Sequence, residues 1–399
     1  MSETLPQVRC CGDARTMGRQ QGVAMRENIL EALVEIGKLE AFRLLKPRWM
    51  PMRLFRRVAE GKAHRFMRHA FRGTRLQSAC NDGAGKHSAG TEMEQRFLGI
   101  CEGAGLSEPR LALCCLLEAV MSDLTGSSRT QPSALQAGCS AIAVTGPASE
   151  DGHARVMHNF DHVPVVQRFF IVRRSSPAGK LRSVEFTFSP LLGAVDGVNE
   201  AGLGVTCNYA YVADRLSAAP TITMVIARVL AEATTVGEAV ELIANQPRAG
   251  GGLLMLADAH GDVKSLEVSN SRVETRAADQ GFLFHTNRLQ CGAMSALEIG
   301  ADAQYDHRAP SLLRGRRVHE SADLRAEAIQ RAVVGRFPLS LGDMHQILSG
   351  HAHGDSCNSL CMHGDYWSTT ACTQLLPRER KIRVAFDNAC QAELHEFEV

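Results

Sequence analysis

The spacing of apolar residues changes from helical to strand-like about a third of the way along the chain. In residues 21–45, apolar side chains recur at intervals of three and four, which predicts helix, and segments 91–104 and 107–124 show the same period. Short apolar runs bounded by glycine, proline and asparagine begin only after residue 135 and predict strands. The pattern therefore predicts a helical first part, without strands, and a β-rich second part.

Within the second part, strands alternate with two pairs of helices. Strands are predicted at 140–145, 153–158, 168–174, 182–188, 202–207, 252–258, 263–269, 368–376 and 381–386. Helices are predicted at 221–232, 235–246, 311–332 and 341–349. A segment rich in glycine, serine and proline, 126–138, is predicted to be the loop that joins the two parts.

Composition narrows the class of protein. Of the 399 residues, 45% are apolar and 22% charged, which is enough apolar surface for a packed core. The net charge of +1 gives no global reason to bind nucleic acid, and no apolar run reaches the roughly 18 residues that span a bilayer. The start of the chain lacks the basic segment followed by an apolar segment that marks an export signal, so we expect a cytoplasmic protein. We therefore expect its 13 cysteines to be mostly reduced.

The dipeptide Gly138-Cys139 combines a flexible residue with a thiol at the start of the first predicted strand. A cysteine that becomes the first residue of a new chain can use its own α-amine as a base, because that amine has a pKa of roughly 7.7–8.0. Glycine before the cut allows close approach to its carbonyl. The plain alternative is a buried structural cysteine, and the dipeptide alone favours that alternative.

The wider sequence favours chemistry at Cys139, because motifs along nearly the whole chain resemble the penicillin acyltransferase family of self-cleaving cysteine acyltransferases and amide hydrolases. These motifs are GDARTMGRQQG (12–22), GICEGAGLS (99–107), AGCSAIAV (137–144), MHNFDHV (157–163), VNEAGLGVTCNY (198–209), HTNRL (285–289), SLLRGRR (311–317), SCNSLCMH (356–363) and TTACTQLLPRERKIRVAFDNAC (369–390). Each is weak alone, but their order along the chain is specific.

The resemblance implies an α+β fold, the four-layer αββα sandwich of the N-terminal nucleophile hydrolases, with a helical segment in front of it. Residues 1–138 would become a small subunit after self-cleavage between Gly138 and Cys139. Residues 139–399 would form the catalytic subunit, and the two fragments would stay associated as a heterodimer.

The resemblance also implies roles for individual residues. Cys139 would be the nucleophile, and Asp161 would hold the new α-amine or orient the thiol. Asn287 would donate to the oxyanion, with Asn208 as a second contact, and Arg314 would place charge near the nucleophile. Each of the last four has an ordinary structural alternative, such as capping a turn or forming a surface ion pair.

His158, Asn159 and Tyr209 are expected to bind substrate. His158 departs from the family pattern, since relatives that hydrolyse bile salts have arginine there and acyltransferases often have glutamine. Histidine can still donate a hydrogen bond and can titrate near neutral pH. His158 and His162 have a spacing that suits two metal ligands only on a helix, and this stretch is predicted to be a strand, so we expect no metal there.

A second group of histidines and cysteines follows near the end of the chain. Its members are His351, His353, Cys357, Cys361 and His363. Their spacing is not one of the usual zinc patterns, so a place in the core or in a substrate channel is the expected role. We expect neither a metal nor a cofactor.

Segment 43–75 carries eleven lysines and arginines against the single acid Glu60. Arg65, Arg68, Arg72 and Arg75 fall on one helical face. The ordinary interpretation is a solvated helix surface. The alternatives are a docking patch for an anionic acyl donor, such as coenzyme A phosphates or an acyl-carrier protein, and a patch for nucleic acid or membrane.

We therefore expect an enzyme that transfers or hydrolyses the acyl group of a small N-acyl amine or acyl thioester through a Cys139 thioester. No nucleic-acid or membrane partner is expected. Two other classes remain open: a protein of the same fold that binds without cleaving, and one that docks an anionic partner through its basic stretch.

Overall fold

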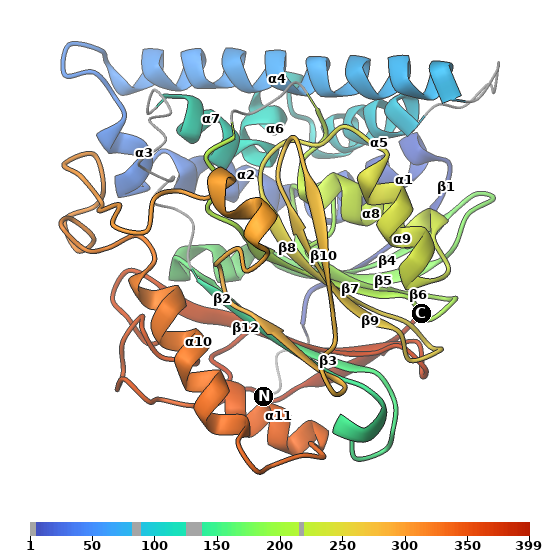
Figure 1. The fold of residues 1–399 in the computed structure, drawn as a ribbon. Coiled ribbons are helices and arrows are strands. Elements are labelled where there is room, and N and C mark those ends of the chain that lie inside the picture. Colours follow the sequence, from blue (N-terminus) through green and yellow to red (C-terminus); the bar gives the residue numbers. More distant parts are fainter. Residues whose placement is uncertain (1–4, 82–88, 125–137, 215–218) are drawn as a thin grey trace.

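Two β-sheets stacked face to face form the body of the protein (Figure 1). The computed structural model describes residues 5–81, 89–124, 138–214 and 219–399. The loop expected at 126–138 lies outside the described residues apart from Gly138. All element and contact statements below refer to the described parts of the chain.

The larger sheet has eight strands in the order β1-β4-β5-β6-β7-β8-β9-β10 and the smaller has six in the order β11-β2-β3-β12-β13-β14. The larger sheet comprises β1 (Gln7–Gly12), β4 (Phe170–Pro177), β5 (Ser183–Phe188), β6 (Asp196–Asn199), β7 (Gly204–Tyr209), β8 (Gly252–Ala257), β9 (Val263–Val268) and β10 (Val273–Ala277). The smaller comprises β11 (Phe282–His285), β2 (Cys139–Val144), β3 (Arg155–His162), β12 (Ser368–Leu376), β13 (Lys381–Ala385) and β14 (His395–Glu398).

Helices cover the outer face of each sheet. Helices α8 (Ile222–Glu232) and α9 (Val236–Ala244) pack their apolar sides on the larger sheet, and α10 (Glu320–Val333) and α11 (Leu341–Leu348) pack on the smaller. A third apolar cluster, which includes Phe186, lies between the sheets. The order of layers is thus helix, sheet, sheet, helix, as the family resemblance implies for residues 139–399.

The first part of the chain is helical and lies beside the larger sheet, at the top of Figure 1. It comprises α1 (Ala14–Ala24), α2 (Arg26–Ile36), α3 (Glu40–Leu44), α4 (Met52–Asn81), α5 (Ala89–Ala104), α6 (Glu108–Cys115) and α7 (Leu117–Leu124). These helices share one apolar cluster that also includes residues of the second part, such as Ile171 and Trp367.

The structure corrects two of the secondary-structure predictions, a missed strand and the start of a helix. The expectation of no strand before residue 135 is wrong, because β1 pairs in parallel with β4 at the edge of the larger sheet. Its sequence, QVRCCG, alternates buried and exposed positions but has one β-branched residue, so its strand signal is weak. The helix predicted at 311–332 begins only at Glu320, after turns in which Gly315 has a φ of +78°.

Two glycine pairs allow α1 and α5 to pack at backbone contact. A Cβ added to Gly18 or Gly22 on α1 would lie 2.1 Å or 2.5 Å from a carbonyl oxygen of α5. A Cβ on Gly99 or Gly103 of α5 would lie 2.2 Å or 2.3 Å from a carbonyl oxygen of α1. The glycines of the two N-terminal motifs therefore serve helix packing.

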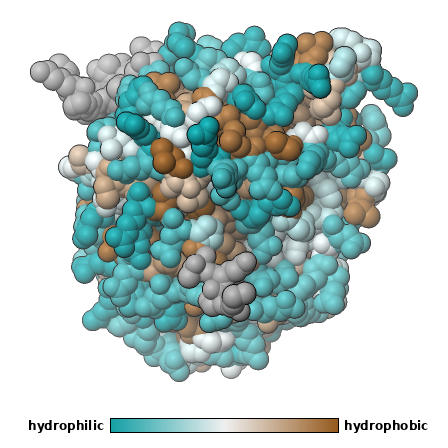
Figure 2. All heavy atoms as spheres, turned by 180° about the vertical axis from the view of Figure 1, so that it is seen from behind, coloured by the Kyte–Doolittle hydropathy of each residue, from teal (hydrophilic) through white to brown (hydrophobic). Residues whose placement is uncertain are grey.

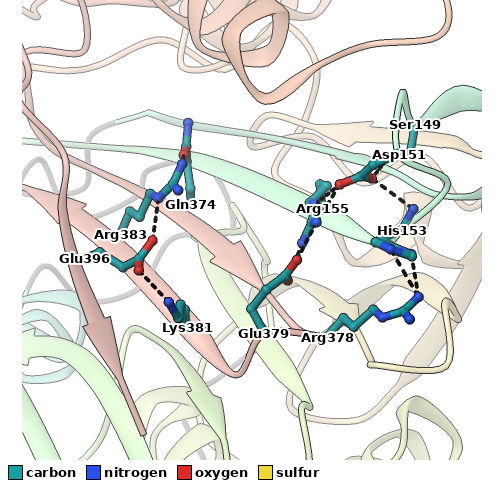
Figure 3. Close-up of polar contacts among 10 residues, drawn as sticks. All are labelled: Ser149, Asp151, His153, Arg155, Gln374, Arg378, Glu379, Lys381, Arg383 and Glu396. Carbon is teal, nitrogen blue, oxygen red and sulfur yellow. Dashed lines mark hydrogen bonds and ion pairs between the residues drawn. The ribbon is translucent and has the colours of Figure 1, made fainter.

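An ion-pair network pins the six-stranded sheet at the end opposite Cys139 (Figure 3). The buried Arg155 guanidinium at the start of β3 pairs with Asp151, in the turn before β3, and with Glu379, in the turn after β12. Because a one-residue slip would reverse the faces of β2, fixing this end supports the register that places Cys139 opposite Phe160.

Hydrophilic side chains dominate the face shown in Figure 2, with apolar groups gathered in its upper half, at the level of the N-terminal helices. The exposed large apolar side chains of that segment are Val23, Val34, Trp49, Leu54 and Val58. Among the described residues, none of the helices combines the length and the apolar character needed to cross a bilayer.

Replacing Gly99 by alanine is expected to destabilise the fold, because its Cβ would overlap the Arg15 carbonyl and force α1 and α5 apart. The expected loss is about 1–3 kcal/mol of unfolding free energy, measured by urea denaturation. Gly61→Ala in α4 is the matched control, since its Cβ would meet nothing within 4 Å and should add about 0.5–1 kcal/mol. Equal effects of the two variants would contradict the close crossing.

Candidate active site

Cys139 opens β2 in a buried position, with 3% of its surface exposed. Alternate residues of a strand share a face, so Cys139 lies on the same face of β2 as Ala141 and Ala143, which pack between the sheets. Its backbone N–H donates to Oδ1 of Asn287 over 2.9 Å. The structure thus brings together the predicted nucleophile and one of its predicted partners.

The Asn287 carboxamide is held on both sides. Its Nδ2 donates to the Tyr209 carbonyl over 2.9 Å, and its Oδ1 accepts from both the Cys139 nitrogen and Nη2 of Arg325. The contact that the structure provides is therefore an acceptor for the nucleophile's nitrogen, whereas the sequence predicts a donor to the oxyanion.

Arg325, on α10, is the charged residue that lies against the nucleophile. Its guanidinium is buried and donates to the Cys139 carbonyl over 2.5 Å and to the Ser140 hydroxyl over 2.8 Å. A Cβ on Gly138 would lie 2.2 Å from Nη2 of this guanidinium. A side chain at 138 would therefore force the Arg325 guanidinium away from its hydrogen-bond partners.

Arg314 does not take the place predicted for it. Its side chain is exposed, and its Nε donates to the Ala309 carbonyl in the turns before α10. Arg325 occupies the expected position instead. A sequence signal for it exists, because Arg325 falls on the apolar face of α10 between Ala322 and Ile329, where an unpaired cation would be costly.

His158 and Asp196 form a second charged group beside the thiol, between the sheets. Nδ1 of His158 lies 2.8 Å from Oδ2 of Asp196, and both side chains are fully buried. Burial alone would lower the pKa of His158, but the charge and hydrogen bond of Asp196, together with the Cys139 thiol, raise it to about 10. The imidazole is therefore a cation at neutral pH.

Asp196 is not among the site residues predicted from the sequence. Thr373 donates to its Oδ2 over 2.7 Å and the Cys207 backbone N–H donates to its Oδ1 over 3.2 Å. The available signal is a lone carboxylate within the apolar run GAVDGV, which needs a buried partner.

Asp161 lies on β3 near both cations. Its Oδ1 accepts from the Thr369 hydroxyl over 2.6 Å, and its Oδ2 is buried without a hydrogen bond among the described residues. Burial raises the pKa of Asp161, the nearby charges of Arg325 and His158 lower it, and the result is a pKa of about 7. This carboxyl can hold or release a proton near neutral pH.

Three other predicted residues have mainly structural contacts. Asn159 donates to the carbonyls of Leu348 and Leu360, which ties β3 to the α11 layer on the face away from the thiol. The buried Asn208 donates to the Thr286 carbonyl over 2.9 Å. Tyr209 is half-buried, and its ring packs on that of Tyr211 with centroids 5.3 Å apart.

Part of the basic stretch is neutralised locally. Arg56 pairs with Glu60 on α4, and Lys62 pairs with Asp123 of α7. Five arginines of α4 expose their side chains: Arg53, Arg57, Arg65, Arg68 and Arg72. The described side chains thus include an exposed basic face, and nothing in the structure identifies a partner for it.

Comparison with known proteins identifies a family match. Residues 148–389 match the family model described as acyl-coenzyme A:6-aminopenicillanic acid acyltransferase. The match begins after Cys139 but includes His158, Asp161, Asn287 and Arg325. No curated protein sequence matches this chain.

The solved structures that match this chain share little sequence with it. A Caenorhabditis elegans N-acylethanolamine-hydrolyzing acid amidase ortholog is 14% identical, with 65% of this chain and 100% of that chain covered and a TM-score of 0.42. A conjugated bile acid hydrolase from Clostridium perfringens is 12% identical, with 65% and 97% covered and a TM-score of 0.39. Penicillin V acylase from Agrobacterium tumefaciens is 15% identical, with 65% and 86% covered and a TM-score of 0.38.

The raised pKa of His158 makes the ion pair with Asp196 pH-dependent in a defined direction. Its stabilisation is fully present below the ordinary histidine pKa of about 6.5 and is lost as the pH rises through about 10. The loss of unfolding free energy caused by Asp196→Asn should therefore be largest near pH 6 and shrink toward pH 10. Urea denaturation across this range measures it.

Asp151→Asn is the matched control. Hydrogen bonds from Arg155, His153 and Ser149 outweigh burial and lower the pKa of Asp151 to about 2. Its stabilisation is present above the ordinary aspartate pKa and is lost only as the pH falls toward about 2. Its effect should stay constant from pH 6 to pH 10, and a constant effect of Asp196→Asn would contradict the pair.

Proposed function

This chain belongs to the acyl-coenzyme A:6-aminopenicillanic acid acyltransferase family, and from that membership we propose that it is a self-cleaving cysteine enzyme that hydrolyses or transfers acyl groups. The observation that carries the proposal is the environment of Cys139. A carboxamide oxygen faces its nitrogen, a buried guanidinium binds its carbonyl, and a histidine held as a cation lies beside its thiol.

Self-cleavage would begin when the Cys139 sulfur attacks the Gly138 carbonyl carbon. The carbon–sulfur bond forms as the carbon–nitrogen bond breaks, and the nitrogen takes up a proton to become an α-amine. Water then cleaves the thioester, which leaves a carboxylate on Gly138 and returns the thiol. Asn287 supports this proposal, since its Oδ1 is already within 2.9 Å of the nitrogen that would become the amine.

His158 would place a positive charge beside the Cys139 sulfur, where negative charge moves during the attack on a carbonyl carbon. Asp196 keeps His158 protonated, so this histidine can supply the positive charge that arginine supplies in bile-salt relatives. The α-amine and Asp161, with a pKa of about 7, remain as groups that can move protons.

In turnover, Cys139 would attack an amide or thioester carbonyl of the substrate and form an acyl thioester. Water would complete hydrolysis, and an amine would complete transfer. For the oxyanion we propose the second Nδ2 hydrogens of Asn287 and Asn208, whose first hydrogens bind the carbonyls of Tyr209 and Thr286, together with backbone N–H groups. The substrate class is a small N-acyl amine or an acyl thioester, and no cofactor is needed for these steps.

Two further proposals concern the whole molecule. The fragments 1–138 and 139–399 would remain together as a heterodimer after cleavage. An acyl donor with phosphate groups, such as an acyl-coenzyme A or a carrier protein, would dock on the exposed arginines of α4. A non-cleaving binding protein is the alternative, and the gel experiment below distinguishes it.

Purified wild-type protein should run on a denaturing gel as fragments of about 15 kDa and about 28 kDa, in proportion to their lengths. Cys139→Ala should run as one band at 43.3 kDa, because it lacks the attacking sulfur. Cys207→Ala is the matched control, since this neighbouring thiol has no role in the proposed cleavage. A single band for wild type, with an unprocessed Cys139, would favour the binding protein.

Short incubation with acyl thioesters or N-acyl amines should add the mass of the acyl group to the fragment that begins at Cys139. Intact-mass spectrometry measures the adduct, and peptide mapping assigns it. An added amine should shorten the lifetime of the adduct if the enzyme is a transferase and leave it unchanged if it is a hydrolase. An adduct on another residue would contradict the role of Cys139.

A further inference from the structure

Four metal-binding side chains meet near the end of the chain, outside the candidate active site. They are His351, Cys361, His363 and Cys390, and one ligand atom from each lies within 4.8 Å of all the others. His351 follows α11, Cys361 and His363 lie in the segment between α11 and β12, and Cys390 lies in the turn between β13 and β14. Sequence spacing did not point to this set, because Cys390 is far along the chain from the other three.

The distances agree with those of a tetrahedral zinc site. Zinc bonds of about 2.3 Å to sulfur and about 2.0–2.1 Å to nitrogen place a sulfur and a nitrogen about 3.6 Å apart at tetrahedral angles. Nε2 of His363 lies 3.5 Å from Sγ of Cys361 and 3.3 Å from Sγ of Cys390. The His351 and His363 rings have centroids 5.0 Å apart, which leaves room for both rings around one ion.

We propose that His351, Cys361, His363 and Cys390 bind one zinc ion. Two thiolates and two imidazoles form the Cys2His2 set typical of structural zinc, and four protein ligands leave no open position for a substrate. Calcium and magnesium prefer oxygen ligands, so they do not suit this set. The inference stands independently of the proposed function.

The ion would brace the segment that supports the candidate active site. Met362, between two of the ligands, donates its backbone N–H to the Thr369 hydroxyl, which in turn donates to Asp161. The Met362 side chain also packs against Gly138, where a Cβ would lie 2.7 Å from its Cε. On the other side, the side chain of Asn388, two residues before Cys390 in the chain, donates to the Met362 carbonyl.

No helix or strand fixes this segment. Residues between Gly350 and Trp367 form turns and one isolated bridge, from His363 to Ser368, and are otherwise held by side-chain and turn hydrogen bonds. The ion would replace the missing ladder by joining this segment to the β13–β14 turn. Zinc binding at a preformed site also stabilises the folded state by mass action.

The test is the zinc content of the purified full-length protein, measured by inductively coupled plasma mass spectrometry after dialysis without chelator. Wild type should retain about one zinc per chain, as expected for a closed structural site. Cys390→Ser and His351→Ala should each lose most of it. Both positions are exposed, so these variants should still fold. Cys11→Ser, an exposed cysteine of β1, should keep the wild-type content.

A second measurement tests whether the bound metal stabilises the fold. Adding a strong chelator should lower the melting temperature of wild type and of Cys11→Ser but leave that of Cys390→Ser unchanged. Cobalt substitution should give the visible absorption of a tetrahedral thiolate site in wild type and in Cys11→Ser but not in Cys390→Ser. The proposal is overturned if wild type prepared under reducing conditions with added zinc retains none, or if Cys390→Ser retains as much as wild type. A Cys361–Cys390 disulfide in that preparation would also overturn it.

Discussion

The burial of the Arg325 guanidinium under the first residues of β2 is the constraint on which the candidate active site depends. A buried charge is costly unless hydrogen bonds replace its water. Arg325 donates to the Cys139 carbonyl, the Ser140 hydroxyl, the Asn287 carboxamide and the Ser321 hydroxyl. Because these acceptors belong to β2, to the segment after β11 and to α10, satisfying the charge fixes the path of all three. A Cβ at 138 would displace this guanidinium, which glycine avoids.

Positive groups lie on both sides of β2 at Cys139, an arrangement that suits a negative charge developing there. Arg325 lies on the outer side of β2, and His158 lies on the inner side, between the sheets. Each cation has a carboxyl group near it, Asp161 and Asp196, but the two carboxyls differ. Asp196 accepts three hydrogen bonds and serves as the partner of His158, whereas Asp161 has one oxygen buried without a partner. A negative charge forming at Cys139 would therefore meet two positive groups that are already in place.

The helical and β-rich parts could be predicted because helix and strand periods are encoded locally. The order of the layers and the role of Cys139 came from motifs that resemble the matched family. That family is confirmed for residues 148–389, and the role of Cys139 stays a prediction. The arginine near the nucleophile was predicted at Arg314, because the segment 311–319 resembles the start of a helix. In the structure Gly315 has a positive φ and the helix begins only at Glu320, so the arginine in that position is Arg325. Asp196 has a local signal, as a lone carboxylate in an apolar run, but its partner His158 and the partners of Cys390 are identified only when distant strands and turns come together.

The position of β1 affects whether the two fragments would separate after cleavage between Gly138 and Cys139. The helical segment does not merely rest on the sheets: β1 extends the larger sheet through a parallel ladder with β4. From α1, the buried Gln21 side chain donates to the carbonyls of Ser189 and Leu191. Separating the fragments would break this ladder and expose those buried acceptors and the apolar cluster that both parts share. Breaking a single peptide bond removes none of these contacts, so the fold would hold the two fragments of a cleaved chain together.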